Sequence, residues 1–122
     1  MVDDNLDARE MYCMYLTHDG FDCVEADNGE DALRIAYERR PALILMDATM
    51  PGMDGWMAAE LLKADPDLKT TPVVMLTAHA FDEHRQRAQA IGTDGFLAKP
   101  VLPDELARAV REILDGSSPR EN

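Results

Sequence analysis

The sequence predicts an α/β domain in which helices cover both faces of a parallel sheet. Strand-like and helix-like segments alternate from one end of the 122 residues to the other, as they do in parallel sheets joined by right-handed crossovers. Residues 42–46 form an unbroken apolar run, which is typical of a strand that helices cover on both sides. A chain of this length has room for one domain with one core.

The predicted elements make a (βα)5 arrangement. They are a strand stub at residues 1–2, helix 6–16, strand 21–26, helix 30–40, strand 42–46, helix 56–64, strand 72–77, helix 82–91, strand 95–98 and a final helix around residues 106–114.

Local chemistry supports each boundary in the first half. Asn5 is placed to cap the first helix, and Gly20 closes that helix. The segment 21–26 alternates apolar and polar residues, as a half-buried strand does. A turn at residues 27–29 precedes the second helix, and Pro41 ends that helix.

The second half has equally clear boundaries. The loop 48–55 is rich in glycine and separates strand 42–46 from the next helix. Pro72 opens the following strand, at a position where strands tolerate proline. Gly92 stops one helix and Gly116 stops the last. We therefore predict one domain over residues 1–116, followed by a polar tail over residues 117–122.

The first strand does not fit this pattern. Only Met1 and Val2 precede Asp3, where a central strand would supply about five apolar residues. Losing about three such residues, at ~1.5–3 kcal/mol each, approaches the whole stability of a small domain. We expect either that the natural chain extends further upstream or that a truncated first strand weakens the sheet beside it.

Composition and charge exclude several classes of partner. The formal charge is −12, from 12 basic and 24 acidic residues, and nucleic-acid binding depends on clustered Lys and Arg. No apolar run approaches the ~20 residues that a membrane-spanning helix needs. The N-terminus also lacks the pattern of a secretory signal. These features predict a cytoplasmic protein that binds neither nucleic acid directly nor a membrane.

Residues that often build metal or redox sites are isolated in this sequence. Cys13 and Cys23 lie ten positions apart without metal-ligand spacing, so we expect two buried thiols in preference to a disulfide. His18, His79 and His84 have no ligand-type neighbours, and we expect them on the solvated surface.

Four apolar segments end at side chains that together could form one site. Asp3 and Asp4 follow the first, Asp47 follows the second, and Thr77 and Lys99 follow the other two. Ligands of open α/β sheets bind beyond the carboxyl ends of the strands. Three carboxylates cannot all stay ionised there without a cation, and Mg²⁺ commonly takes carboxylates, waters and phosphate oxygens. A carboxylate nucleophile flanked by Mg²⁺, an ammonium and a hydroxyl is suited to accept a phosphoryl group.

These residues, the loop 47–55 and the Lys99-Pro100 pair resemble the receiver domain of two-component response regulators over nearly the whole chain. The resemblance implies a flavodoxin-like, doubly wound parallel sheet with strand order 2-1-3-4-5, here with a truncated first strand. It also implies a phosphoacceptor switch and not an enzyme, because such a domain catalyses only its own phosphorylation and dephosphorylation. Asp47 would take phosphate from a phosphohistidine on a sensor histidine kinase or histidine phosphotransfer protein.

The same resemblance implies a metal site. Asp4 would bind Mg²⁺ directly, and Asp3 would bind it chiefly through water. Asp47 and the backbone carbonyl of Thr49 would complete the protein ligands.

Further roles follow from the resemblance. Lys99 would pair with the phosphoacceptor and then with the phosphoryl oxygens, while the hydroxyl of Thr77 would bond to the phosphoryl group. Phe96 occupies the place of a rotating aromatic switch. Thr49 and His79 would tune the lifetime of the phosphorylated state.

Phosphorylation would reshape the face made by the fourth helix, the fifth strand and the fifth helix, residues 82–114, where a homodimer would also form. The resemblance raises the expectation of a cis Lys99-Pro100 bond above the ordinary ~5–6%.

Two other functions stay open. Phosphatases and mutases with an aspartyl nucleophile usually carry a second acid two residues later, where this chain has Thr49, and they need a cap insertion for which it has no room. A phosphate-independent binding module is disfavoured because all five chemical positions are present. The cognate kinase, the output, the oligomeric state and the phosphate lifetime cannot be read from the sequence.

Overall fold

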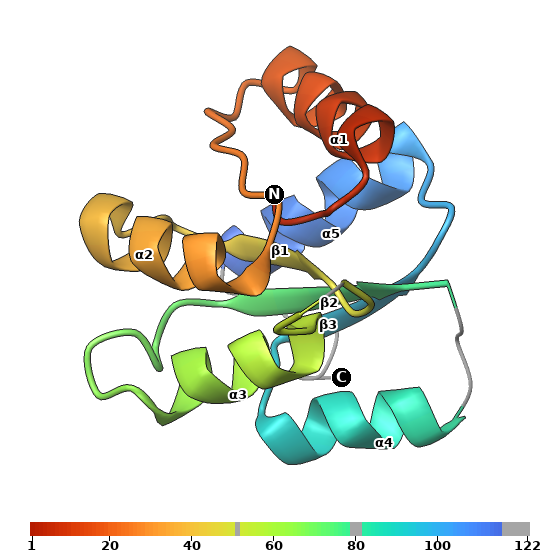
Figure 1. Ribbon diagram of the computed structural model, residues 1–122. Coiled ribbons are helices and arrows are strands. Elements are labelled where there is room, and N and C mark those ends of the chain that lie inside the picture. The colour runs from red at the N-terminus through yellow and green to blue at the C-terminus, as the bar shows by residue number, and fades with distance from the viewer. Residues whose placement is uncertain (51, 79–81, 116–122) are drawn as a thin grey trace.

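The fold is a parallel sheet between two layers of helices (Figure 1). The computed structural model describes residues 1–50, 52–78 and 82–115. In chain order the elements are α1 (Leu6–His18), α2 (Gly29–Arg39), β1 (Ile44–Asp47), α3 (Gly55–Ala64), β2 (Val73–Thr77), α4 (Asp82–Ile91), β3 (Gly95–Ala98) and α5 (Pro103–Leu114). The α/β class predicted from the sequence is confirmed. No helix in these ranges is both long and apolar enough to span a membrane.

Two apolar cores lie on opposite faces of the sheet. Helices α1 and α5 cover one face, where Leu16 and Leu106 are buried. Helices α2, α3 and α4 cover the other, where Leu62 is buried. Met75 and Leu76 of β2 belong to different cores because successive side chains of a strand point to opposite faces. This double burial explains why the strands are uninterrupted apolar runs.

The sheet has three strands in the described part of the chain, in the order β1-β2-β3, and all are parallel. Asp47 is in register with Leu76, and Thr77 is in register with Ala98. The strands therefore end at one common edge. The expected count of five strands is not confirmed: in the described residues, the first two predicted strands are represented by isolated bridges.

Those bridges lie at Val2, which pairs in parallel with both Ala26 and Met46. The segment 21–26 joins the sheet only at its end, so the strand predicted there is not formed. A strand needs a neighbouring backbone along its length. Here that neighbour begins at Met1, whose carbonyl accepts a hydrogen bond of 3.0 Å from the N–H of Ala26.

An apolar cavity of about 640 Å³, here called the N-terminal slot, lies beside this short first segment. Its lining includes Phe21, Val24, Ile44 and Leu114. Met1 also lines the slot, and its α-amino group donates a 2.8 Å hydrogen bond to the carbonyl of Val24. Burial in these surroundings lowers the pKa of this amine from 8.0 to about 6, although the charge of Glu25 opposes the shift.

Cys13 and Cys23 form a disulfide, so the expectation of two buried thiols was wrong. Gly20, at φ +95°, turns the chain back after α1. The returning segment then lies along the helix, with the two Cα atoms 5.6 Å apart, a distance that a disulfide can span. The spacing of Cys13 and Cys23 in the sequence could not show that they pair, because the turn at Gly20 is what brings the two residues together.

The helix ends follow the expected capping chemistry. The side chain of Asn5 accepts a 2.9 Å hydrogen bond from the N–H of Ala8, and Asn28 caps α2 in the same way. Pro103 occupies the first turn of α5, where its missing N–H has no partner to lose. The predicted tail, residues 117–122, lies outside the described residues.

Candidate functional site

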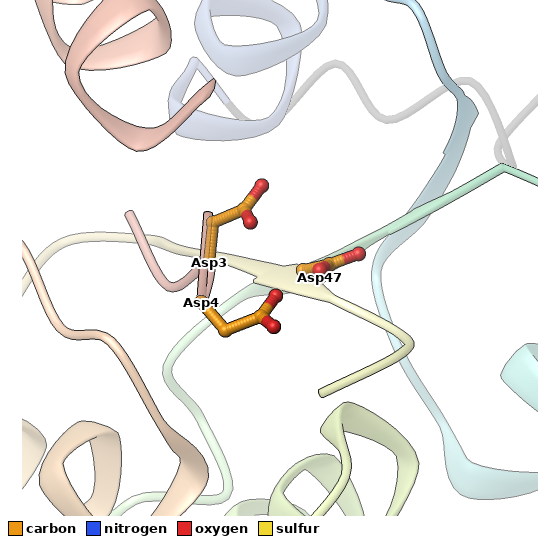
Figure 2. Close-up of side chains that lie close together, drawn as sticks. All are labelled: Asp3, Asp4 and Asp47. Carbon is orange, nitrogen blue, oxygen red and sulfur yellow. The ribbon is translucent and has the colours of Figure 1, made fainter. Parts of the chain in front are cut away.

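Three carboxylates converge at the carboxyl edge of the sheet, as predicted. Asp47 ends β1, while Asp3 and Asp4 follow the bridge at Val2. One ligand oxygen from each carboxylate lies within 4.8 Å of the others. Figure 2 shows the side chains of Asp4 and Asp47 directed toward a common space beside the sheet. Asp3 and Asp47 are buried and Asp4 is exposed, so the cluster opens to solvent on the Asp4 side.

Lys99 brings a positive charge to this cluster. Its Nζ lies 2.7 Å from Oδ2 of Asp3 and 3.3 Å from Oδ1 of Asp47. The expected pairing with Asp47 is present, but Asp3 is the closer partner. Lys99 directly follows β3, and the Lys99-Pro100 bond is cis. The ammonium thus bridges the two buried carboxylates.

The pKa values of two groups in the site are shifted. Burial raises the pKa of Asp47 and the charge of Asp3 adds to the increase, while Lys99 and the backbone N–H of Thr49 oppose it. Burial would lower the pKa of Lys99, but hydrogen bonds and charge from Asp3 and Asp47 outweigh it and raise that pKa. The carboxylate of Asp47 is therefore poorly solvated, and a further cation bound beside it would stabilise its charged form.

Backbone contacts hold Asp3 in place. Its Oδ1 accepts a 2.9 Å hydrogen bond from the N–H of Asn5. Its carbonyl accepts a 3.0 Å hydrogen bond from Arg9, whose guanidinium also pairs with Glu25 at 2.9 Å. No pattern along the chain pointed to Arg9, because its contact with Asp3 depends on α1 lying over the strand end.

Gly55 allows α3 to begin directly against the end of β1. A Cβ atom at this position would lie 1.9 Å from the carbonyl oxygen of Asp47. Asp54 caps the helix by accepting a 2.8 Å hydrogen bond from the N–H of Met57. Thr49 is exposed, and its backbone N–H is near enough to the carboxylate of Asp47 to lower the pKa of that group. Small residues and caps therefore place the loop close to the carboxylates.

Thr77 and Phe96 lie at different depths. Thr77 is buried, and its Oγ1 lies 3.2 Å from Nδ1 of His84. Phe96 is half-buried and packs against one of the apolar cores, with the guanidinium of Arg85 5.7 Å from its ring centroid. His79 lies outside the described residues.

The expectation of a solvated His84 was wrong. Its side chain is half-buried and lies edge-on to the ring of Trp56 at 5.6 Å. The contact depends on α3 and α4 packing side by side, which local sequence does not reveal.

The donor set fits a hard divalent cation. All three clustered side chains offer carboxylate oxygens, which Mg²⁺ prefers, and Mg²⁺ usually keeps several waters. The exposed Asp4 leaves one side of the cluster accessible to water and to phosphate oxygens.

Comparisons with known proteins give consistent findings. The family model of the response regulator receiver domain matches residues 1–111. The phosphate regulon transcriptional regulatory protein PhoB of Pseudomonas aeruginosa is 33% identical over 100% of this chain and 53% of its own length. The transcriptional regulatory protein ResD of Bacillus subtilis is 35% identical over 97% of this chain and 48% of its own length. This chain thus spans about half the length of such relatives.

Two solved structures share the fold. The chemotaxis protein CheY4 of Vibrio cholerae superposes with a TM-score of 0.87 and 31% identity, over 92% of this chain and 93% of that one. The signal receiver domain of a signal transduction histidine kinase from Syntrophus aciditrophicus has a TM-score of 0.86 and 35% identity, over 94% and 87%.

Proposed function

Because this chain belongs to the response regulator receiver domains, the phosphoacceptor domains of two-component systems, we propose that Asp47 is its phosphoacceptor. The observation that supports this assignment is the convergence of Asp3, Asp4 and Asp47 at the strand ends, with Lys99 bridging two of them. We infer the family's strand order 2-1-3-4-5, with the bridges at Ala26 and Val2 in the places of the second and first strands.

The reaction is a transfer between two nucleophiles. A carboxylate oxygen of Asp47 forms a bond to phosphorus, the phosphorus–nitrogen bond of a phosphohistidine breaks, and the electron pair stays on the imidazole nitrogen. Catalysis of such a step is mostly positioning and charge neutralisation. Nζ of Lys99 is already 3.3 Å from Oδ1 of the attacking carboxylate, so its ammonium can pair with the phosphoryl oxygens once they are transferred. The donor is a sensor histidine kinase or a histidine phosphotransfer protein in the cytoplasm.

Asp3, Asp4, Asp47 and the carbonyl of Thr49 would hold Mg²⁺. When bound, Mg²⁺ neutralises the carboxylates and the incoming phosphoryl oxygens. In the chain itself, Asp3 and Lys99 keep the acceptor oriented. Asp4 supplies the exposed ligand.

Phosphorylation shifts the population between two states. The Thr77 hydroxyl bonds to the phosphoryl group, and Phe96 turns inward from its half-buried position. The face made by α4, β3 and α5 changes as a result and serves as the surface for a partner or a second copy. Thr49 and His79 tune the lifetime of the phosphate.

Intact mass after incubation with acetyl phosphate and Mg²⁺ tests this function. One added phosphate is expected on the wild type, and none on Asp47→Asn or without Mg²⁺. Asp54→Asn is a matched control, since Asp54 caps α3 in the same loop and its loss leaves the acceptor intact. Titration of Mg²⁺ against the fluorescence of the single tryptophan, Trp56 on α3, separates metal binding from transfer.

The outcomes separate the rival functions. A folded wild type without an adduct points to a phosphate-independent binding module. An adduct on Asp47→Asn equal to that on the wild type would reassign the acceptor. Turnover of small phosphate esters that depends on Asp47 would favour a phosphatase or mutase.

A further inference from the structure

The hydroxyl of Thr77 is engaged on the α4 side of the site. Thr77 is the last residue of β2 and is 1% exposed. Its Oγ1 lies 3.2 Å from Nδ1 of His84 in α4. Meanwhile the carboxylate of Asp47 pairs with the ammonium of Lys99, with Oδ1 and Nζ 3.3 Å apart. The hydroxyl that the proposed function assigns to the phosphoryl group therefore already has a bond to the imidazole.

The indole of Trp56 packs against the ring of His84. The imidazole lies edge-on to the indole, with 5.6 Å between ring centroids and an interplanar angle of 79°. Trp56 is 4% exposed, and the guanidinium of Arg87 lies over its ring at 5.0 Å. His84 thus connects the end of β2 to both α3 and α4, and the surrounding packing sets the position of Nδ1.

We propose that His84 is a positioning residue for Thr77, an inference that depends on the proposed function. In the unphosphorylated protein, Nδ1 accepts a hydrogen bond from the Thr77 hydroxyl, with the ring as its neutral Nε2–H tautomer. A hydroxyl carries one hydrogen and donates one hydrogen bond at a time. Phosphorylation of Asp47 therefore exchanges the imidazole for a phosphoryl oxygen and frees α4 from the strand end.

The exchange sets how easily the switch turns on. The bond to His84 stabilises only the unphosphorylated arrangement, so removing the acceptor favours the phosphorylated one. A single hydrogen bond of ordinary net strength corresponds to a shift of about five-fold in that equilibrium. The proportion phosphorylated at subsaturating acetyl phosphate measures the shift directly.

Four proteins test the role of His84. In His84→Leu the acceptor is absent, whereas in His84→Asn the amide oxygen lies near the position of Nδ1. Gln86→Leu alters an exposed residue of the same helix and serves as the control. We expect the ratio of phosphorylated to unphosphorylated protein to rise about five-fold in His84→Leu and to stay near the wild-type value in the other two variants.

Nitrogen NMR of the imidazole supplies a readout that packing alone would not change. In unphosphorylated protein, Nδ1 of His84 should show the shift of a hydrogen-bonded, unprotonated nitrogen. Thr77→Val, which lacks the hydroxyl, should move that signal, and acetyl phosphate with Mg²⁺ should move the wild-type signal in the same direction. Melting curves confirm that each variant is folded.

The results distinguish the two proposals. An adduct on the wild type with equal ratios in all four proteins, or an Nδ1 signal that Thr77→Val leaves unmoved, overturns the role of His84 alone. No adduct on folded wild type overturns the proposed function, and the exchange with it. A Nδ1 signal that shows a bound proton also overturns the proposed direction of the hydrogen bond.

Discussion

Filling the N-terminal slot should stabilise this protein. The perturbation is an extension of Val-Leu-Val before Met1, which continues the first segment between residues 21–26 and β1. The slot has about 640 Å³ and a mostly apolar lining, with Asp22, Glu25 and Arg39 as its charged members. A Ser-Gly-Ser extension of the same length is the control, because it also converts the amine of Met1 to an amide without adding apolar side chains.

The amine and the side chains contribute separately. The pKa of the Met1 amine is lowered from 8.0 to about 6 in the folded protein, so between these values the unfolded state binds more protons and stability rises with pH. Burying the charged amine lowers the free energy of unfolding by ~2.7 kcal/mol below pH 6 and by ~1.4 kcal/mol at pH 7. Either extension replaces the amine by an amide and should therefore remove this destabilisation together with its pH dependence.

The apolar extension should gain more. Each buried side chain contributes ~1.5–3 kcal/mol and each new ladder hydrogen bond ~1 kcal/mol, while ordering each residue costs ~1.5–2.5 kcal/mol. At mid-range values three residues leave a net gain of roughly 4 kcal/mol, or roughly 15 °C in Tm for a chain of this size.

The assay is thermal unfolding of all three proteins from pH 5.5 to 8.5. Equal Tm values for the two extensions would show that the slot does not accept a strand. A wild-type Tm without the rise between pH 6 and pH 8 would refute the burial of the amine.

Three further predictions concern the site and the disulfide. Asp47→Asn should raise Tm at pH 7, because burial raises the folded-state pKa of Asp47 above 3.8. The stability lost to its buried charge grows from pH 3.8 up to the folded pKa and is complete above it, so melts should show the gain shrinking to nothing below pH 3.8, and no gain at pH 7 would contradict it. Gly55→Ala should lower the free energy of unfolding by roughly 3 kcal/mol or more in urea titrations, since its Cβ would lie 1.9 Å from a backbone oxygen; Gly52→Ala, where nothing lies within 4 Å but φ is +73°, should lose only ~1 kcal/mol. Reducing the Cys13–Cys23 disulfide should cost ~2–3 kcal/mol, as expected for the loop it closes, and dithiothreitol should leave the Tm of the double serine variant unchanged.

Local sequence was sufficient for the class of fold and for most of the site. Buried strands covered on both faces must be apolar throughout, so 42–46 could be recognised without a structure. Parallel strands end at one edge, so Asp47, Thr77 and Lys99 could be placed together before any distance was known. Caps such as Asn5 act within one helical turn, and they too were predicted correctly.

Other features depended on packing between distant segments. Whether 21–26 forms a strand is decided by the backbone beside it, and only Met1 to Asp3 lie there. Lys99 has two carboxylates within reach, and only the position of Asp3 made it the closer partner.

The sequence by itself therefore determined the alternation of elements, the two-faced burial of the sheet and the set of residues at its carboxyl edge, because periodicity, capping and strand direction are local properties. Tertiary structure alone decided that Cys13 meets Cys23 and that His84 reaches Thr77. Both contacts join separate segments, and their distances follow from how helices pack on the sheet, which no spacing along the chain encodes.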